Sequence, residues 1–189
     1  LVYFYCQNQT TVSRLYIKNG GASAADISVD KLDNATLTAG SSQSHVFTNI
    51  FGDLMTHTRA SVKLLQEVNV VTGAATTMTL PNFKESTLGG CSFELGGKEL
   101  IAYNIKGTDY NSEWNLYNMT DKEFVSAETL YAKDRTSKKT SGAANWLNVQ
   151  VVDEETAYIY QFCPEVAVAV WKVSLINTVV IDDKAVNST

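Results

Sequence analysis

The chain has 189 residues, of which 44% are hydrophobic and 19% charged, and its formal net charge is -5. This composition is typical of a folded globular protein, and a chain of this length can bury about 70% of its unfolded surface. The charge is spread along the sequence without the Lys/Arg clusters that nucleic acid requires, and no apolar run reaches the roughly 18 residues of a membrane span.

Short runs in which apolar and polar residues alternate fill the first half of the chain, which is the pattern of half-buried strands. The segment 60–71 is ambiguous because Val62, Leu65, Val68 and Val71 recur at helical spacing, yet its β-branched residues favour a strand. We interpret it as a strand. The expected strands are 2–6, 11–18, 26–32, 35–38, 44–51 and 60–71.

The second half has a clearer pattern. Gly96-Gly97 separates two apolar runs and is the strongest hairpin signal in the chain, because glycine adopts the positive φ of a tight turn at low cost. A polar, glycine-ending segment at 81–90 is a candidate seam, so the chain is either a single domain over 1–189 or two β sub-domains. The expected strands are 91–95, 98–106, 113–117, 124–133, 146–152, 157–163 and 166–181.

So many short strands, without crossover helices between them, predict an all-β antiparallel fold. We expect a β-sandwich, Ig-like or jelly-roll-like, with a closed β-barrel as the alternative.

Motifs of catalysis and metal binding are missing from the sequence. It has no Gly-x-Ser-x-Gly elbow, no His-Glu-x-x-His and no phosphate-binding loop, and its two histidines are His45 and His57. The oxygen-bearing segment 109–113 resembles the start of a calcium loop, but it lacks the glycine and the closing glutamate. The sequence therefore predicts no enzyme, no cofactor and no metal.

Two features indicate an extracellular or cell-surface protein. Four Asn-x-Ser/Thr sites are candidate glycan acceptors, at Asn8, Asn34, Asn118 and Asn187. The cysteines at 6, 91 and 163 allow one internal disulfide, for which Cys91 and Cys163 are the preferred pair; free buried thiols are the alternative. The first residue is not Met, which fits either a processed end or a trimmed one.

Aromatic residues are frequent, and they either line a ligand cavity or fill the core. The run 146–163 resembles the late strand pair of lipocalins, in which an acidic turn precedes an alternating Tyr-rich strand ending in a half-cystine. This resemblance implies a barrel around a small apolar ligand. The candidate lining residues are Trp114, Trp146, Tyr158 and Tyr160.

Segments 14–21 and 24–29 resemble the strand-turn-strand of Ig-like surface and filament subunits. Both ends of the chain also carry apolar β runs that no proline guards, at 166–181 and at Val2, Tyr3, Phe4 and Tyr5. Such strands either complete the domain's own sheet or add to a neighbour's sheet. We therefore expect a non-enzymatic protein of interaction or assembly, which self-associates or binds another protein, with the lipocalin-like carrier as the alternative.

Overall fold

The structure is a computed structural model that describes residues 2–5, 12–32, 44–51, 53–58, 65–69, 71–81, 90–105, 111–131, 146–163, 167–175 and 178–188. The described residues are almost entirely in antiparallel strands, and their only helical turns are two 3-10 turns, η1 (Asn19–Gly21) and η2 (Ala24–Asp26). The prediction of an all-β antiparallel fold is confirmed.

The described strands form four sheets. The first sheet contains β1 (Val2–Tyr5), β2 (Val12–Ile17) and β3 (Ile27–Leu32). The second contains β4 (Ser44–Thr48), β5 (Leu54–Thr58), β6 (Leu65–Val68) and β7 (Ala75–Met78). The third contains β8 (Gly90–Leu95), β9 (Lys98–Ile105), β10 (Asn111–Asn118) and β11 (Glu123–Tyr131), and the fourth contains β12 (Trp146–Val151), β13 (Thr156–Cys163), β14 (Ala167–Leu175) and β15 (Val179–Ser188).

Within each sheet, strands that follow one another in sequence also pair side by side, so every sheet is a meander. The predicted Gly-Gly hairpin joins β8 to β9, and both glycines have positive φ, 58° at Gly96 and 73° at Gly97. The run predicted at 166–181 is two strands, since β14 ends at Leu175 and β15 begins at Val179. Segment 60–71 contributes β6, which confirms a strand there, whereas segment 35–38 lies outside the described residues.

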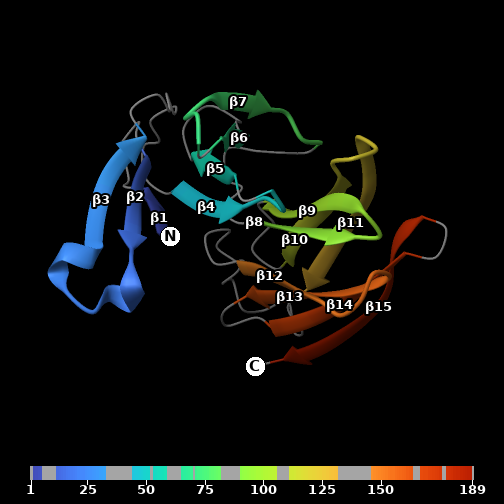
Figure 1. Cartoon of the computed structure of the whole chain (residues 1–189). Coiled ribbons are helices and arrows are strands. Elements are labelled where there is room, and N and C mark those ends of the chain that lie inside the picture. The colour runs from blue at the N-terminus through green and yellow to red at the C-terminus, as the bar shows by residue number, and fades with distance from the viewer. Residues whose placement is uncertain are drawn as a thin grey trace.

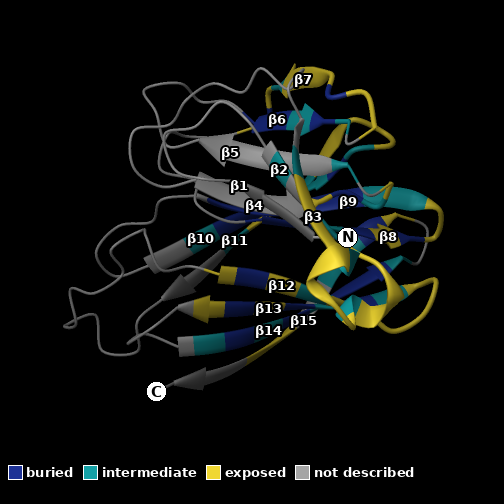
Figure 2. Cartoon of the chain, turned by 60° about the vertical axis from the view of Figure 1, so that its left-hand side comes forward, coloured by how far each residue is buried: buried dark blue, intermediate teal, exposed yellow. Residues whose placement is uncertain are grey.

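The second, third and fourth sheets pack face to face in series, as in a sandwich (Figure 1). One face of the third sheet packs on the fourth sheet through Leu100, Trp114 and Leu116. Its other face packs on the second sheet, where Ile101 and Tyr103 join a cluster with residues before the third sheet. These two clusters form the core, and buried residues lie where sheets meet while the β2–β3 connection is exposed (Figure 2).

The first strands of successive sheets lie next to one another: β1 contacts β4, β4 contacts β8, and β8 contacts β12. Four-stranded meanders arranged around neighbouring first strands are the arrangement of blades in a β-propeller. The described strands do not close into a barrel, because the fourth sheet does not pair with the first. The candidate seam at 81–90 separates the second sheet from the third, and its residues 82–89 lie outside the described residues.

Candidate interaction surface

The two faces of the fourth sheet differ in what covers them. Alternate residues of β13, namely Ala157, Ile159 and Gln161, are buried and face the third sheet. Because successive side chains of a strand point to opposite faces, Tyr158, Tyr160 and Phe162 lie on the other side. This second side has no sheet of the described chain against it.

Three rows of paired residues cross this second side. They are Trp146 with Phe162 and Val168, Asn148 with Tyr160 and Val170, and Gln150 with Tyr158 and Lys172. We call its apolar members the outer face, which consists of Trp146, Tyr158, Tyr160, Phe162, Val168 and Val170.

Aromatic side chains dominate the outer face. Trp146 and Phe162 stack with their ring centroids 5.6 Å apart and an interplanar angle of 15°. Trp146 is 50% exposed, Phe162 43% and Tyr160 37%. The Tyr160 hydroxyl donates a hydrogen bond of 2.9 Å to Gln150 Oε1, which fixes that ring against the sheet. The result is an ordered apolar surface that remains open to solvent.

The opposite face of the same sheet is closed. Trp171 packs edge-on against Trp114 of the third sheet, with centroids 5.5 Å apart and an angle of 77°. Its indole N–H donates a bond of 3.0 Å to Gln161 Oε1, so a buried polar group is satisfied. Lys184 Nζ lies 4.7 Å from the centroid of the Trp171 ring. By contrast, Trp114 Nε1 has no hydrogen-bond partner.

The four residues predicted to line a ligand cavity do not converge. Trp114 is fully buried between the third and fourth sheets, whereas Trp146, Tyr158 and Tyr160 lie on the outer face. The fourth sheet therefore separates Trp114 from the other three. The described chain encloses no barrel cavity that all four could line.

Of the two cysteines in the predicted Cys91–Cys163 disulfide, the structure describes the side chain of Cys91. The Cys91 thiol is free and buried among the side chains that join the third and fourth sheets. Burial raises its pKa from 9.0 to about 12, because the charged thiolate is costly in an apolar environment. Of the two alternatives, a free buried thiol is the one found at Cys91; the Cys163 side chain lies outside what the structure describes.

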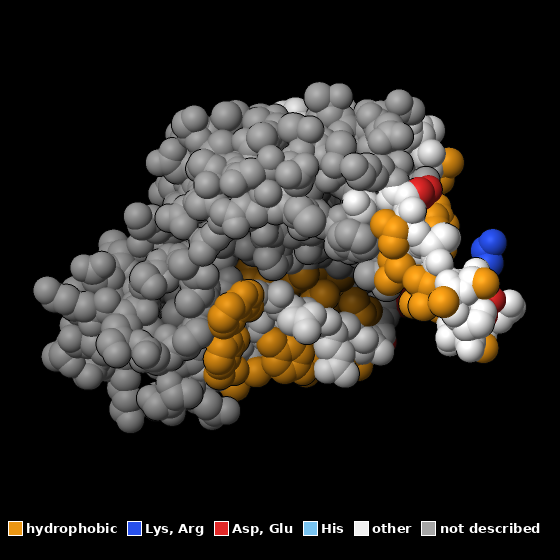
Figure 3. Space-filling view, turned by 90° about the vertical axis from the view of Figure 1, so that its left-hand side faces the viewer, with side chains coloured by type: hydrophobic (Ala, Val, Ile, Leu, Met, Phe, Trp, Pro, Cys, Tyr) orange, Lys and Arg blue, Asp and Glu red, His pale blue; other side chains and the backbone are white. Residues whose placement is uncertain are grey.

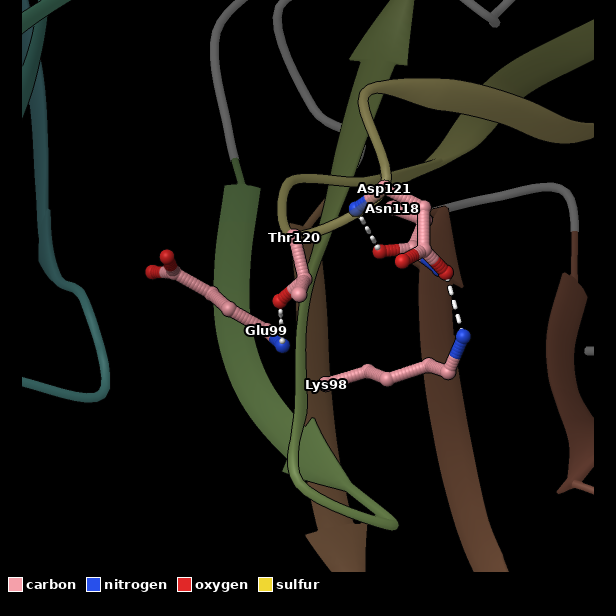
Figure 4. A network of polar contacts seen from close by, with 5 residues as sticks. All are labelled: Lys98, Glu99, Asn118, Thr120 and Asp121. Atoms are coloured by element: carbon pink, nitrogen blue, oxygen red, sulfur yellow. Dashed lines mark hydrogen bonds and ion pairs between the residues drawn. The ribbon is translucent and has the colours of Figure 1, made fainter.

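The glycan acceptor predicted at Asn118 is a buried side chain in the structure. Asn118 is 1% exposed at the end of β10, where its Nδ2 donates a bond of 2.8 Å to Asp121 Oδ2 and its Oδ1 accepts one of 3.0 Å from the Asp121 N–H (Figure 4). The Thr120 hydroxyl accepts a bond of 2.9 Å from the Glu99 N–H, so the third residue of the sequon is engaged as well. Glycan attachment requires an accessible Asn side chain, which this turn does not provide.

The other three predicted acceptor sites fall outside the described residues or side chains. Asn8 and Asn34 lie outside the described residues, and Asn187 lies in β15 with its side chain outside them. His45 and His57 pair with each other across β4 and β5, and their side chains are likewise outside the description.

Lys98 completes the polar network of Figure 4 by pairing with Asp121. The hydrogen bond from Lys98 lowers the pKa of the Asp121 carboxyl from its usual value, and the Asn118 amide acts in the same direction. Since all five residues belong to β9, β10 or the β10–β11 turn, the network holds the end of the third sheet together.

Acidic side chains gather at one further place. A shallow pocket of about 480 Å³ lies between the tips of two hairpins and is lined by Glu94, Gly96, Gly97, Val151, Asp153 and Glu154.

In the part of the chain that is described, no group of three or more His, Cys, Asp or Glu residues could hold a metal ion. In the same part, no helix is long and apolar enough to cross a membrane.

The strand residues predicted for assembly pair with another strand of the same chain. Val2, Tyr3, Phe4 and Tyr5 form β1, which pairs antiparallel with β2 at the edge of the first sheet. The C-terminal run provides β14 inside the fourth sheet and β15 at its edge. Both ends thus complete the domain's own sheets, which is one of the two outcomes expected from the sequence.

Sequence reasoning missed Phe162, Val168 and Val170 of the outer face. A signal was present, because in β13 and β14 apolar residues occupy both alternating sets of positions. A strand that is apolar on both faces is typical of a sheet covered on both sides. Hydrophobic side chains are visible low on one side of the molecule, over the fourth sheet, and on the projecting β2–β3 hairpin (Figure 3).

No family model matches the sequence, and no curated protein matches it. A solved structure of dihydro-heme d1 dehydrogenase NirN in complex with DHE has a similar fold, with a TM-score of 0.56 and 9% sequence identity over 96% of this chain. This chain covers 34% of that one. At this identity the likeness concerns the fold alone.

Proposed function

We propose that the protein is a non-enzymatic interaction or assembly module that binds a second protein surface through the outer face of its fourth sheet. The observation that carries the proposal is the aromatic surface of Trp146, Tyr160 and Phe162, which is ordered and yet open to solvent. Large contiguous apolar patches on soluble proteins mark interaction sites. Aromatic residues are also the side chains that contribute most to binding at such sites.

The physical reason is the free energy of covering apolar surface. Burying apolar area is worth about 25 cal/mol per Å², and a Trp, Tyr or Phe side chain carries about 150–250 Å². Because the Trp146–Phe162 stack and the Tyr160–Gln150 hydrogen bond already hold these rings in place, less side-chain entropy is lost on binding. A partner sheet of similar apolar character fits this surface.

The experiment is sedimentation velocity on three proteins: the wild type, Trp146→Glu/Phe162→Glu, and the control Val71→Glu. Val71 is 82% exposed in the β6–β7 turn, away from the outer face. We expect the wild type and the control to associate with the same concentration dependence. The double variant should remain at 20.7 kDa, with an unchanged far-UV circular dichroism spectrum. Association that survives the double change would contradict the proposal.

Terminal strand addition belongs to the same proposal as a second mode of assembly. β1 lies at the edge of the first sheet, and a strand edge offers unpaired backbone N–H and C=O groups to another chain. Deleting residues 1–6 tests it. Loss of assembly with the outer face intact would assign the association to β1, whereas unchanged assembly and thermal stability would exclude that role.

We also propose that the protein is extracellular or on the cell surface. The acceptor sites at Asn8, Asn34 and Asn187 support this location. Intact mass of the protein from its source, before and after deglycosylation, tests it. We expect a mass decrease from these sites and none from Asn118, whose side chain is buried.

A further inference from the structure

We propose that Asn19 and Gly20 form a self-modification site, at which the side-chain amide of Asn19 is lost as ammonia and Asp26 sets the rate. The site lies in the connection between β2 and β3, which is exposed to solvent (Figure 2). It includes no residue of the outer face, so this inference goes beyond the proposed function, and either can fail without the other.

The sequence places the two reacting groups next to each other. Asn19 is followed directly by Gly20, and no other asparagine of the chain is followed by glycine. Because glycine lacks a Cβ, its backbone nitrogen is the least hindered nucleophile that can follow an asparagine. Both residues are exposed, and a Cβ built at Gly20 would meet nothing within 4 Å. The backbone around Gly20 is therefore open to water.

The reaction needs only water as a co-reactant. The Gly20 backbone nitrogen attacks the side-chain carbonyl carbon Cγ of Asn19, so an N–C bond forms and the bond between Cγ and Nδ2 breaks. The proton of the attacking nitrogen passes to Nδ2, which leaves as ammonia and leaves an imide ring behind. Water then adds OH to one ring carbonyl carbon and H to the ring nitrogen. The product is an aspartate, linked normally or through its side chain, in keeping with asparagine as a thermolabile residue.

Asp26 holds the side chain that has to react. Asn19 Nδ2 donates a hydrogen bond of 2.9 Å to Asp26 Oδ1, across the connection. Ring closure turns the Asn19 side chain onto its own backbone, so this bond has to open first. The same bond is the largest cause that lowers the pKa of the Asp26 carboxyl from its usual value. Exposed connections open locally at low cost in free energy, so the fold slows the reaction without preventing it.

Asp26 is in turn fixed by Ser23. The backbone N–H and the hydroxyl of Ser23 donate hydrogen bonds of 2.9 and 3.0 Å to Asp26 Oδ2. Together with the bond from Asn19 to Oδ1, these donors engage both oxygens of one carboxylate. Because Asn19 belongs to η1 and Asp26 to η2, this carboxylate joins the two 3-10 turns of the connection.

The modification removes the contact that joins the two turns. An oxygen replaces the NH2 group of Asn19, so a second carboxylate lies where the donor to Asp26 was. Like charges this close repel each other. In the product linked through its side chain, the backbone also gains one carbon, which changes the turn that Asn19 forms at a φ of 48°. The β2–β3 connection is therefore closed before the reaction and released after it.

The experiment follows the mass of the Asn19 peptide while the folded protein is kept at neutral pH and physiological temperature. Samples are cut with pepsin at acid pH and measured by mass spectrometry. The internal control is Asn148, which is also exposed but is followed by Val149, whose backbone N–H donates a bond of 2.8 Å to Asn148 Oδ1. We expect the mass gain of NH2 replaced by OH at Asn19 and not at Asn148. Gly20→Ala should suppress it.

Two variants test the control by Asp26. Asp26→Ala removes the bond to Asn19, and we expect amide loss to become about two- to tenfold faster, the factor that corresponds to one hydrogen bond. Ser23→Ala is the matched control, because it removes a bond to the same carboxylate and leaves the bond from Asn19 in place. Its rate should equal that of the wild type. Far-UV circular dichroism checks that each variant keeps its fold.

The contrary results are distinct. If the folded wild type keeps the Asn19 amide while the urea-unfolded chain loses it, the fold blocks the reaction and the site is overturned. If Asp26→Ala reacts no faster than the wild type, or Ser23→Ala reacts as fast as Asp26→Ala, the hydrogen bond from Asn19 to Asp26 does not set the rate.

Discussion

The third and fourth sheets are built alike but covered differently. Both are four-stranded meanders with apolar residues on both faces. The third sheet has a neighbour on each face, and Tyr103 and Trp114 on its opposite faces are both buried. Among the described sheets the fourth has one neighbour, so Trp171 is buried while Trp146 is half exposed. The difference shows that burial here depends on the place of a sheet in the series.

The tryptophans of these two sheets differ in what covers them. Trp114 and Trp171 hold the third and fourth sheets together, whereas no other sheet among the described strands covers Trp146. Substitutions on the covered faces should therefore change the free energy of unfolding. Substitutions on the outer face should change association.

The largest effect is expected from Trp114→Ala, because Trp114 is fully buried between the third and fourth sheets. Removing a buried Trp costs about 3–5 kcal/mol of unfolding free energy. The matched change Trp146→Ala should cost about 1 kcal/mol or less when measured on the monomer. Urea unfolding followed by circular dichroism measures both, and equal losses would remove the distinction between the two faces.

Alkaline pH should destabilise the third sheet through two buried groups, Cys91 on the face toward the fourth sheet and Tyr103 on the face toward the second. Burial raises the pKa of the Cys91 thiol from 9.0 to about 12 and that of the Tyr103 hydroxyl from 10.0 to about 12. Both groups ionise earlier in the unfolded chain, so stability is full below pH 9 and decreases as the pH rises toward 12. The slope for each titrating group is about 1.4 kcal/mol per pH unit.

Cys91→Ala tests that assignment, since it should move the onset of the decrease from about pH 9 to about pH 10, where Tyr103 begins to titrate in the unfolded chain. Urea unfolding at half-unit pH intervals provides the measurement. An onset that Cys91→Ala leaves at pH 9 would mean that another group controls the alkaline response.

A smaller effect is expected at the β8–β9 turn. An added Cβ at Gly96 would lie 2.0 Å from Leu175 Cδ2 of the fourth sheet, whereas one at Gly97 meets nothing within 4 Å. Both residues have positive φ, which costs a non-glycine residue about 1–2 kcal/mol. Gly96→Ala should therefore lower the melting temperature more than Gly97→Ala. Equal shifts would show that Leu175 moves aside freely.

The smallest effect is expected at the exposed pair of Lys98 and Asp121. Exposed ion pairs contribute about 0–1 kcal/mol, and salt screens them. Lys98→Met should lower the melting temperature least among these variants, and the difference should shrink further in 0.5 M NaCl, where the Debye length is well below its value of about 10 Å at 0.1 M. A larger, salt-independent loss would mean that the turn depends on this pair.

Local features of the fold were accessible from the sequence, and packing between distant segments was not. The Gly96-Gly97 hairpin follows from turn chemistry alone, and the alternating runs identified most strands. β7 was missed because Ala75, Thr76 and Thr77 are all exposed, so no apolar alternation marks it. Trp114 and Trp146 look equivalent in sequence, and only the order of the sheets separates a core residue from a surface one.

The same limit applies to Asn118 and Cys91, whose surroundings depend on packing between segments. Asn118 has a complete acceptor motif, but the turn that follows β10 buries its side chain against Asp121. Cys91 lies in an apolar strand, a position equally suited to a disulfide or to a buried thiol, and its free state depends on what the fourth sheet places next to it.

The most direct test of the central claim is acrylamide quenching of tryptophan fluorescence over a dilution series of the wild-type chain. Trp114 and Trp171 are buried at all concentrations, so the quenchable signal comes from Trp146. We expect a quenchable fraction in dilute solution that disappears as concentration rises and the outer face is covered. A Trp146 signal that stays equally quenchable from the lowest to the highest concentration would contradict it.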